Sequence, residues 1–320
     1  MGESSAVPQP DEAELLSWTQ KLSNWGRWGP DDELGTLNYI TGEQRRAAAA
    51  LVRDGDVVSC AKRIGTAPSP DQLYGAPQRL MLMTDGLEGG QSPQSAGPRA
   101  RSSVEYVGFV FHGRNITHLD ALAHVSWDAQ LYNGYPAHTV SRRDGATRLA
   151  VTAIADRGIV TRGILADIAA LRGQDWLRPG EPVLPADLEA AEQRAGIGVG
   201  EGDVLLLRTG RTKARAARPD GELSVPGWHP TCLPWLHERR VALIGCDTTH
   251  DFTPSGSAAV AYPMHNIAIP TMGLWLLDHC DLEALALACS AKRRWEFQFV
   301  LAPLPIEGAT GSPVNPVAIF

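Results

Sequence analysis

Runs of apolar residues, broken by polar and turn residues, predict short strands and helices that follow one another along the chain. The runs at 202–208 and 240–246 are typical of buried strands that are covered on both faces. Pro185 at a first helical position predicts a helix that ends near Gly196. This alternation predicts an α/β fold with a sheet at its centre. Further helices are predicted at 12–22 and 42–52, and further strands at 57–61, 104–111, 158–167 and 294–301.

A late apolar segment is predicted to form a helix and then a strand. The helix opens at His265, is kinked at Pro270 and stops at Gly273. Residues 274–277 then form a short buried strand, with Asp278 at its carboxyl end. Ligands collect at that edge of α/β sheets, so Asp278 is a candidate site residue.

Three segments lie outside this regular pattern. Residues 65–103 are dense in Pro, Gly, Ser and Gln, and such a loop is either a lid, an arm to a partner subunit or a disordered segment. Residues 303–320 contain Pro and Gly and end in apolar residues, so we expect a C-terminal arm that packs across a neighbouring subunit. Residues 1–24 are expected to form a tail and a helix, which leaves 25–302 as one main domain.

Composition and charge narrow the class of protein. Of the 320 residues, 43% are hydrophobic and 20% are charged, as expected for a globular protein with a sizeable core. The formal net charge is −7 and basic residues are scattered, so neither nucleic acid nor a membrane is an expected partner. The absence of a signal pattern and of a run of about 18 apolar residues predicts a cytoplasmic protein. The five cysteines lack C-x-x-C spacing, which argues against a disulfide framework and a thiolate zinc site.

Residues that carry chemistry are concentrated in the thirteen residues from His112 to His124. In extended backbone the side chains alternate between two faces, so His112 and Arg114 would share one face, and His118 and Asp120 would do likewise. Two imidazoles and a carboxylate that converge are suitable ligands for a divalent cation such as zinc or manganese. The structural alternative is a buried strand followed by a polar turn in which a His caps a helix.

The run Thr117-His118-Leu119-Asp120-Ala121-x-x-His124 resembles the core of the motif His-x-Gly-Thr-His-x-Asp-x-Pro-x-His. That motif marks the cyclase family of metal-dependent hydrolases, which includes bacterial kynurenine formamidase, isatin hydrolase and polyketide cyclase-type members. The resemblance covers residues 25–302 as the catalytic domain. It implies a swivelling β/α/β domain, with a central mixed sheet flanked by helices, that assembles as a homodimer or homotetramer. Strings similar to those of longer members occur at 27–38, 131–134, 202–210, 243–247 and 263–285.

The sequence departs from the family's pattern in three places. Arg114 stands where the family has its first ligand His, Leu122 replaces the usual Pro, and Asp278 replaces the usual late Glu. A guanidinium keeps its charge and cannot ligate a cation. Arg114 must therefore turn away from the metal, be neutralised by carboxylates, or replace the metal's positive charge. His112, two residues earlier, could supply the lost imidazole.

The resemblance implies one divalent metal, zinc or manganese, in a site that late residues complete. His265 and Asp278 match the family's late His and acid. The metal would be held by His118 and Asp120, helped by His265 and by either His112 or Asp278. Such an ion would activate a water molecule.

We expect hydrolysis of a C–N bond, an amide or a lactam, in a small molecule that is cyclic or aromatic. His124 would take a proton from water and later pass it to the leaving nitrogen. Arg114 would bind a substrate carboxylate or the developing oxyanion. Trp127, Trp228 and His250 are candidates for contacting the substrate, His250 because it follows a predicted buried strand.

Two alternatives remain open at the level of sequence. If Arg114 displaces the metal, His118, Asp120 and His124 could guide the ring closure or dehydration of a polyketide-like chain, while Arg114 holds the enolate oxygen. Such a cyclase or lyase would be unaffected by chelators. The other alternative is a degenerate member that binds a ligand or a partner without turnover, against which the retained His118, Asp120, His124 and His265 argue.

Overall fold

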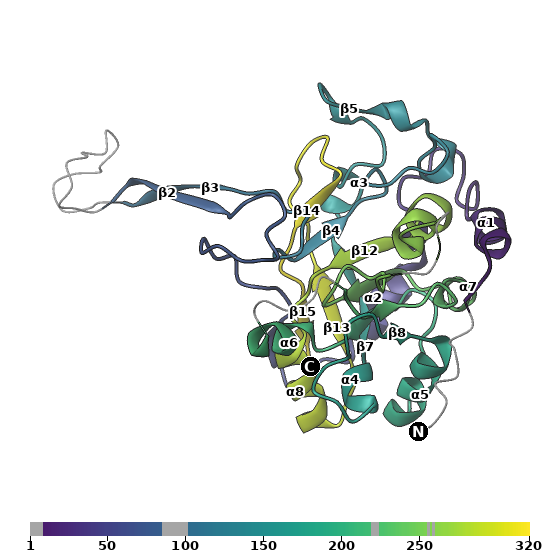
Figure 1. The fold of residues 1–320 in the computed structure, drawn as a ribbon, viewed down its shortest axis with the longest axis vertical. Coiled ribbons are helices and arrows are strands. Elements are labelled where there is room, and N and C mark those ends of the chain that lie inside the picture. Colours follow the sequence, from purple (N-terminus) through teal and green to yellow (C-terminus); the bar gives the residue numbers. More distant parts are fainter. Residues whose placement is uncertain (1–8, 85–101, 219–223, 255–256, 258–259) are drawn as a thin grey trace.

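In the residues that the structure describes, a nine-stranded mixed sheet runs through the middle of the protein (Figure 1). The computed structural model describes residues 9–84, 102–218, 224–254, 257 and 260–320. The predicted α/β fold, with a central mixed sheet flanked by helices, is confirmed. The strands lie in the order β1 (Val57–Ser59), β15 (Val317–Ile319), β13 (Glu296–Leu301), β7 (Ile159–Asp167), β9 (Val204–Arg208), β11 (Leu243–Cys246), β12 (Trp275–Asp278), β4 (His118–Asp120) and β14 (Gly311–Pro313).

The central strands of the sheet are parallel. β7, β9, β11 and β12 run in the same direction, and antiparallel strands extend the sheet on both sides. Every residue of β9, β11 and β12 is buried, which is why their apolar runs show no alternation. The buried strands predicted at 202–208, 240–246 and 274–277 are thus confirmed.

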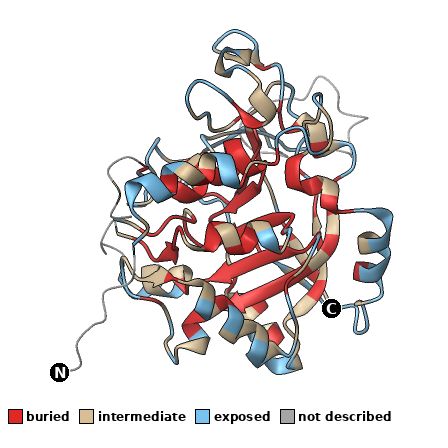
Figure 2. Ribbon diagram, turned by 90° about the vertical axis from the view of Figure 1, so that its right-hand side faces the viewer, coloured by how far each residue is buried: buried red, intermediate tan, exposed pale blue. Residues whose placement is uncertain are grey.

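Local sequence explains where several helices begin and end. The Asp11 carboxylate accepts a hydrogen bond from the Glu14 amide at the start of α1, and Thr41 opens α2 with a capping box. α5 starts at Pro185 and ends at Gly196 in left-handed backbone with φ 67°, as predicted. Figure 2 shows helices with exposed outer faces around the buried strands.

The helices of the described residues are short, and none is long and apolar enough to cross a membrane. Short two-stranded pairs join β5 (Val140–Ser141) to β6 (Gly145–Ala146) and β8 (Pro182–Val183) to β10 (Gly227–Trp228). The α-helices are α1 (Glu12–Lys21), α2 (Gly42–Ala49), α3 (Thr152–Ala155), α4 (Ile168–Leu171), α5 (Pro185–Ala195), α6 (Arg211–Ala217), α7 (Cys232–Glu238) and α8 (Glu283–Lys292). The others are the π-helix η4 (Met264–Met272) and the 3-10 helices η1 (Gly35–Tyr39), η2 (Tyr132–Gly134) and η3 (Ala137–Thr139).

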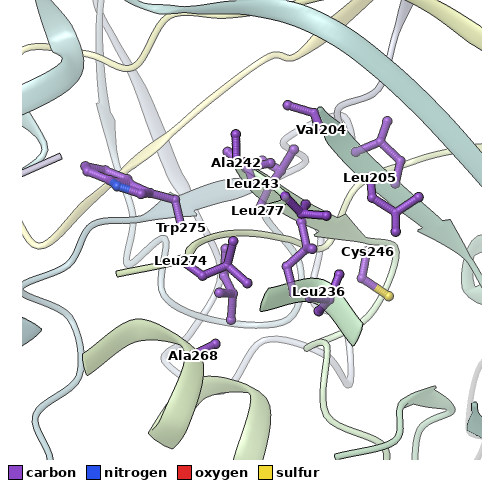
Figure 3. Packing of buried hydrophobic residues seen from close by; sticks show 14 of the residues in the cluster. Val204, Leu205, Leu236, Ala242, Leu243, Cys246, Ala268, Leu274, Trp275 and Leu277 are labelled. Carbon is purple, nitrogen blue, oxygen red and sulfur yellow. The ribbon is translucent and has the colours of Figure 1, made fainter. Parts of the chain in front are cut away.

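The hydrophobic core lies where the central strands meet α7 and η4. Figure 3 shows Val204, Leu243 and Leu277, from three neighbouring strands, close to Leu236 of α7 and Ala268 of η4. Each of these five side chains is at most 1% exposed. Such close packing holds the strand ends rigidly, and those ends carry the site described below.

The strand predicted at 104–111 forms over Val104–Gly108 as β3, but it is not buried. β3 (Val104–Gly108) pairs with β2 (Gln78–Met83) in a hairpin that projects from the body (Figure 1). Its apolar side chains are exposed, Leu82 by 63% and Val107 by 51%. The sequence of a short apolar run does not show whether another helix or strand covers it, so the exposure of this strand could not be predicted. Within the predicted loop, residues 85–101 lie outside the described residues, and contact with a second subunit stays a prediction.

The C-terminal segment belongs to the sheet of its own chain and is not the expected arm. β14 pairs with β4, and β15 pairs with β13 and with β1. β13, which the sequence predicted as the last strand, is therefore followed by two more. Strands of three residues are too short for a hydrophobic period to reveal them.

Gly35 lies where η1 approaches the end of η4. Its φ is +55°, and a Cβ atom there would lie 2.2 Å from the carbonyl oxygen of Gly273. Gly55 also has a positive φ, +76°, but nothing lies within 4 Å of the position of its Cβ. In urea denaturation we expect Gly35→Ala to lower the free energy of unfolding by about 3 kcal/mol or more, and Gly55→Ala by only about 1 kcal/mol. Equal losses would contradict this close approach.

Candidate active site

The candidate site forms where β12 and β4 lie side by side, at the carboxyl edge of the central strands. Their antiparallel register pairs Asp278, the last residue of β12, with His118, the first residue of β4. His118 and Asp120 are two residues apart on one strand, so their side chains point to the same face. His118 Nε2 lies 3.6 Å from Asp120 Oδ1 and 4.0 Å from Asp278 Oδ2. A single strand pair thus joins an early and a late carboxylate.

His265 brings a second imidazole to the same point. It lies at the start of η4, and its Nε2 is 3.7 Å from Asp120 Oδ2 and 3.6 Å from Asp278 Oδ2. The ligand atoms of a tetrahedral ion with bonds of about 2.0–2.2 Å are about 3.3–3.6 Å apart. The ligand atoms of His118, Asp120 and Asp278 lie within 4.8 Å of one another, and His265 faces both carboxylates at 3.6–3.7 Å, which is close to the spacing that a bound ion requires.

Hydrogen bonds on the far side of each ring leave the converging nitrogens free. His118 Nδ1 donates to the carbonyl oxygen of Ile116 at 2.9 Å, so the lone pair of its neutral ring is on Nε2. His265 Nδ1 lies 2.6 Å from Asp251 Oδ2, while Asp251 Oδ1 accepts from the Met264 amide at 2.7 Å. Carbonyl and carboxylate groups orient metal-binding histidines in this way.

The Asp120 carboxylate shows most clearly that the site fits a cation. Its side chain is 1% exposed, and neither oxygen has a hydrogen-bond partner among the described residues. His112 Nδ1 is 3.0 Å from Asp120 Oδ1 but does not meet it at a hydrogen-bonding angle. Burying a charge without partners is costly, so such groups are rare. Imidazole nitrogens and carboxylate oxygens together suit zinc or manganese.

Both carboxylates of the site stay ionised in spite of their burial. Burial alone would raise the pKa of Asp278, but the facing imidazoles of His250 and His265 outweigh it and hold this pKa well below its usual range. The pKa of Asp120 is lowered in the same way, since the surrounding imidazoles, His124 foremost, outweigh the effect of burial. Two negative charges therefore face one small volume.

His250 lies behind Asp278, so its predicted role as a substrate contact is corrected. Its ring is fully buried, with Nδ1 2.5 Å from Asp278 Oδ1 and Nε2 3.3 Å from the carbonyl oxygen of Ile244. These contacts fix one oxygen of Asp278 and leave the other facing His265. His250 is thus a positioning residue for the carboxylate.

His112 and His124 lie against Asp120 as a stacked pair. Their ring centroids are 4.0 Å apart and their planes differ by 6°. Their ring nitrogens and an Asp120 oxygen lie within 4.8 Å of one another. However, an imidazole binds an ion close to its own plane, where the lone pair lies, so two parallel rings do not converge on one ion. Of the two helper ligands considered from the sequence, the geometry favours Asp278 over His112.

His124 is the accessible imidazole of the group. Its side chain is 28% exposed, and its Nε2 lies 3.9 Å from Asp120 Oδ1. Burial lowers the pKa of His124, and the nearby Asp120 charge offsets this only in part. An accessible neutral imidazole is suited to accepting a proton.

Among the described residues, Arg114 is not paired with either of the two carboxylates. Residues 112–116 form bends and not extended backbone, so the predicted shared face of His112 and Arg114 does not exist. In the described part of the chain, the Arg114 guanidinium forms no ion pair within 4.0 Å with Asp120 or Asp278. Of the three placements derived from the sequence, neutralisation of Arg114 by Asp120 or Asp278 is therefore not observed.

Of the two predicted aromatic contacts, Trp228 belongs to the core, whereas Trp127 is partly buried and stays a prediction. Trp228, in β10, is fully buried, and its amide donates to the carbonyl oxygen of His250 at 2.7 Å. A fully buried ring cannot contact a substrate, so this prediction is corrected: Trp228 supports the segment that carries His250. Trp127 lies in a turn closed by backbone hydrogen bonds with Gln130 and packs against the hydrophobic core.

Two further residues, Asp251 and His279, complete the site. Asp251 orients His265, and the His279 ring stacks on His118 with centroids 6.1 Å apart. His250 and His279 both adopt left-handed backbone, with φ 57° and 56°. Such conformations are uncommon outside glycine and cluster at functional sites. The sequence indicates these residues only through their position directly after two buried strands.

Comparisons with known proteins agree with this fold and motif. A family model described as "Putative cyclase" matches residues 32–250. A crystal structure described as a novel cyclase is 30% identical with a TM-score of 0.83, and the match covers 94% of this chain and 99% of that chain. No curated protein sequence matches the chain.

Two isatin hydrolases share the fold at lower identity. Isatin hydrolase A from Ralstonia solanacearum is 23% identical, with a TM-score of 0.56 over 87% of this chain and 97% of that chain. Isatin hydrolase A from Labrenzia aggregata, bound to benzyl benzoate, is 20% identical, with a TM-score of 0.58 over 85% of this chain and 94% of that chain. The family model and the 30% identical structure each span more than half of the chain, which therefore belongs to the cyclase family.

Proposed function

We propose that this protein is a metal-dependent hydrolase that cleaves a C–N bond, an amide or a lactam, in a small cyclic or aromatic substrate. The observation that carries the proposal is that the imidazoles of His118 and His265 each face both carboxylates, Asp120 and Asp278, at distances of 3.6–4.0 Å. Isatin is an aromatic lactam, and the isatin hydrolases that share this fold support the reaction class by analogy.

These four residues would hold the cation. When bound, a zinc or manganese ion supplies a Lewis acid that polarises a carbonyl group and makes water a stronger acid. The two carboxylates balance the double positive charge, and the two imidazoles add neutral donors. Ile116 and Asp251 keep the two rings oriented from behind.

His124 moves the proton. It accepts a proton from water as the water oxygen bonds to the carbonyl carbon, and it returns that proton to the nitrogen as the C–N bond breaks. Its side chain is 28% exposed, so both water and substrate can reach it. The Asp120 oxygen, 3.9 Å from Nε2, steadies the ring while it carries the positive charge.

Arg114 is proposed to bind negative charge on the substrate, either a carboxylate or the developing oxyanion. In the part of the chain that the structure describes, its guanidinium pairs with neither Asp120 nor Asp278, so its charge remains available to a ligand. The metal-free cyclase alternative needs Arg114 to lie between these carboxylates in place of the ion. The position of Arg114 gives that alternative no support.

Metal content tests the ligand assignment. We expect the purified wild-type protein to bind about one zinc or manganese ion per chain by inductively coupled plasma mass spectrometry. Asp120→Ala should lose the ion, because Asp120 faces both imidazoles, whereas the exposed control Asp156→Ala should keep it. Arg114→His should change the stoichiometry little. An ion that appears only in Arg114→His would mean that Arg114 occupies the metal's place.

Turnover separates the role of His124 from metal binding. With the best substrate from a panel of aryl amides and lactams, His124→Ala should keep the metal and lower kcat by about 10²–10⁴-fold, because the general acid–base is lost. His118→Ala should lose both metal and turnover. Undiminished kcat in His124→Ala would remove His124 from the proposed reaction.

A further inference from the structure

A group of basic side chains lies next to the metal-binding residues, and Lys62 is at its centre. The Lys62 amide donates to Thr117 Oγ1 at 2.9 Å, and Thr117 Oγ1 in turn donates to the carbonyl oxygen of His279 at 2.7 Å. Thr117 precedes His118, and His279 follows Asp278. The Lys62 backbone is thus linked through the Thr117 hydroxyl to the backbone of His279.

Two arginines belong to the same group. The Lys62 ammonium donates to the carbonyl oxygen of Arg114 at 3.4 Å. Arg211 begins α6 and has a guanidinium that is only 13% exposed, with Nη2 3.6 Å from Asp71 Oδ1. The Arg211 amide donates to Asp247 Oδ2 at 3.0 Å, and the next residue, Thr248, accepts a hydrogen bond from the His279 amide at 3.1 Å, which places Arg211 near His279.

The acidic residues nearby do not balance this charge. Arg215 binds both oxygens of Asp71, so the negative charge of Asp71 is divided between Arg215 and Arg211. The Asp247 carboxylate is engaged by the amides and hydroxyl of residues 209–211. Within the described residues, neither Lys62 nor Arg114 has a carboxylate within 4.0 Å. Positive charge is left over.

His279 is in contact with the metal-binding residues, since it follows Asp278 and its ring stacks on His118. Its side chain is 4% exposed, and neither ring nitrogen has a hydrogen-bond partner among the described atoms. An imidazole ring carries at least one N–H in either protonation state, and here neither ring nitrogen of His279 has a partner within the described residues. Buried donors of this kind normally have a partner, which points to a ligand.

We propose that Lys62, Arg114, Arg211 and His279 bind a carboxylate, and that the substrate is an amide or lactam that carries one. An oxyanion that develops during the reaction would be stabilised by the metal ion, whose charge Asp120 and Asp278 balance. The side chains of Lys62, Arg114 and Arg211 lie beside the metal site, so they suit a permanent anion on the substrate. That anion would also accept the His279 N–H. The choice of substrate rests on the proposed function, whereas the binding of an anion does not.

Calorimetric titration with benzoate tests the proposal. The protein is first treated with a chelator, so that benzoate cannot bind to a metal ion. We expect benzoate to bind and neutral benzamide not to bind, with affinity falling as salt is added. Lys62→Met should weaken benzoate binding by at least about tenfold, because one of the partnering charges is lost. The control Lys213→Met, a lysine of α6 with a 44% exposed side chain, should bind as the wild type does.

Three results would overturn the inference: no benzoate binding after chelation, equal binding of benzamide, or unchanged binding in Lys62→Met. Arg211→Gln provides a second variant if circular dichroism shows that Lys62→Met is unfolded, and it should lose binding similarly. The tests of the reaction and of anion binding can fail independently. If the wild-type protein has no metal and no turnover but still binds benzoate, only the proposed hydrolase is contradicted. If the protein is metal-loaded and active but does not bind benzoate, only the carboxylate site is contradicted.

Discussion

The pairing of β4 with β12 determines the geometry of the whole site. β4 has three residues, all buried, and β12 and β14 lie on its two sides. The register opposite Asp278 places His118 beside that carboxylate, and the pleat then places Asp120 on the same face. A slip of one residue would turn both side chains to the opposite face. The chemistry thus depends on hydrogen bonds between strands that are far apart in the sequence.

This pairing creates an electrostatic problem that explains the neighbouring residues. Two buried carboxylates, Asp120 and Asp278, face one another across a short distance, and isolated buried charges are costly. His250 and His265 compensate one of them, while Asp120 has no hydrogen bond within the described residues. A divalent cation would resolve this imbalance. In the proposed carboxylate site, the positive charge around Lys62 would attract an anion, so the two halves of the site would bind opposite charges.

The sequence predicted those features that depend on local physics. Capping at Thr41, the ends of α5 and the buried strands β9 and β11 follow from short-range rules, and the two-residue spacing of His118 and Asp120 correctly placed both on one face. Contacts between distant segments escaped prediction. The exposure of β3, the pairing of β14 and β15 with the sheet, and the position of His250 behind Asp278 each depend on which surfaces meet in three dimensions. His112 reaches Asp120 through bends, which no periodic pattern describes.

The central claim is that four residues of this chain surround one cation. The most direct measurement is anomalous X-ray diffraction from a crystal of the zinc-loaded protein, recorded at the zinc absorption edge. The account predicts one strong peak about 2.0–2.2 Å from His118 Nε2, His265 Nε2 and the carboxylate oxygens of Asp120 and Asp278, with Arg114 pointing away from it. A peak bound by His112 and His124, or no peak and the Arg114 guanidinium between the two carboxylates, would contradict the account.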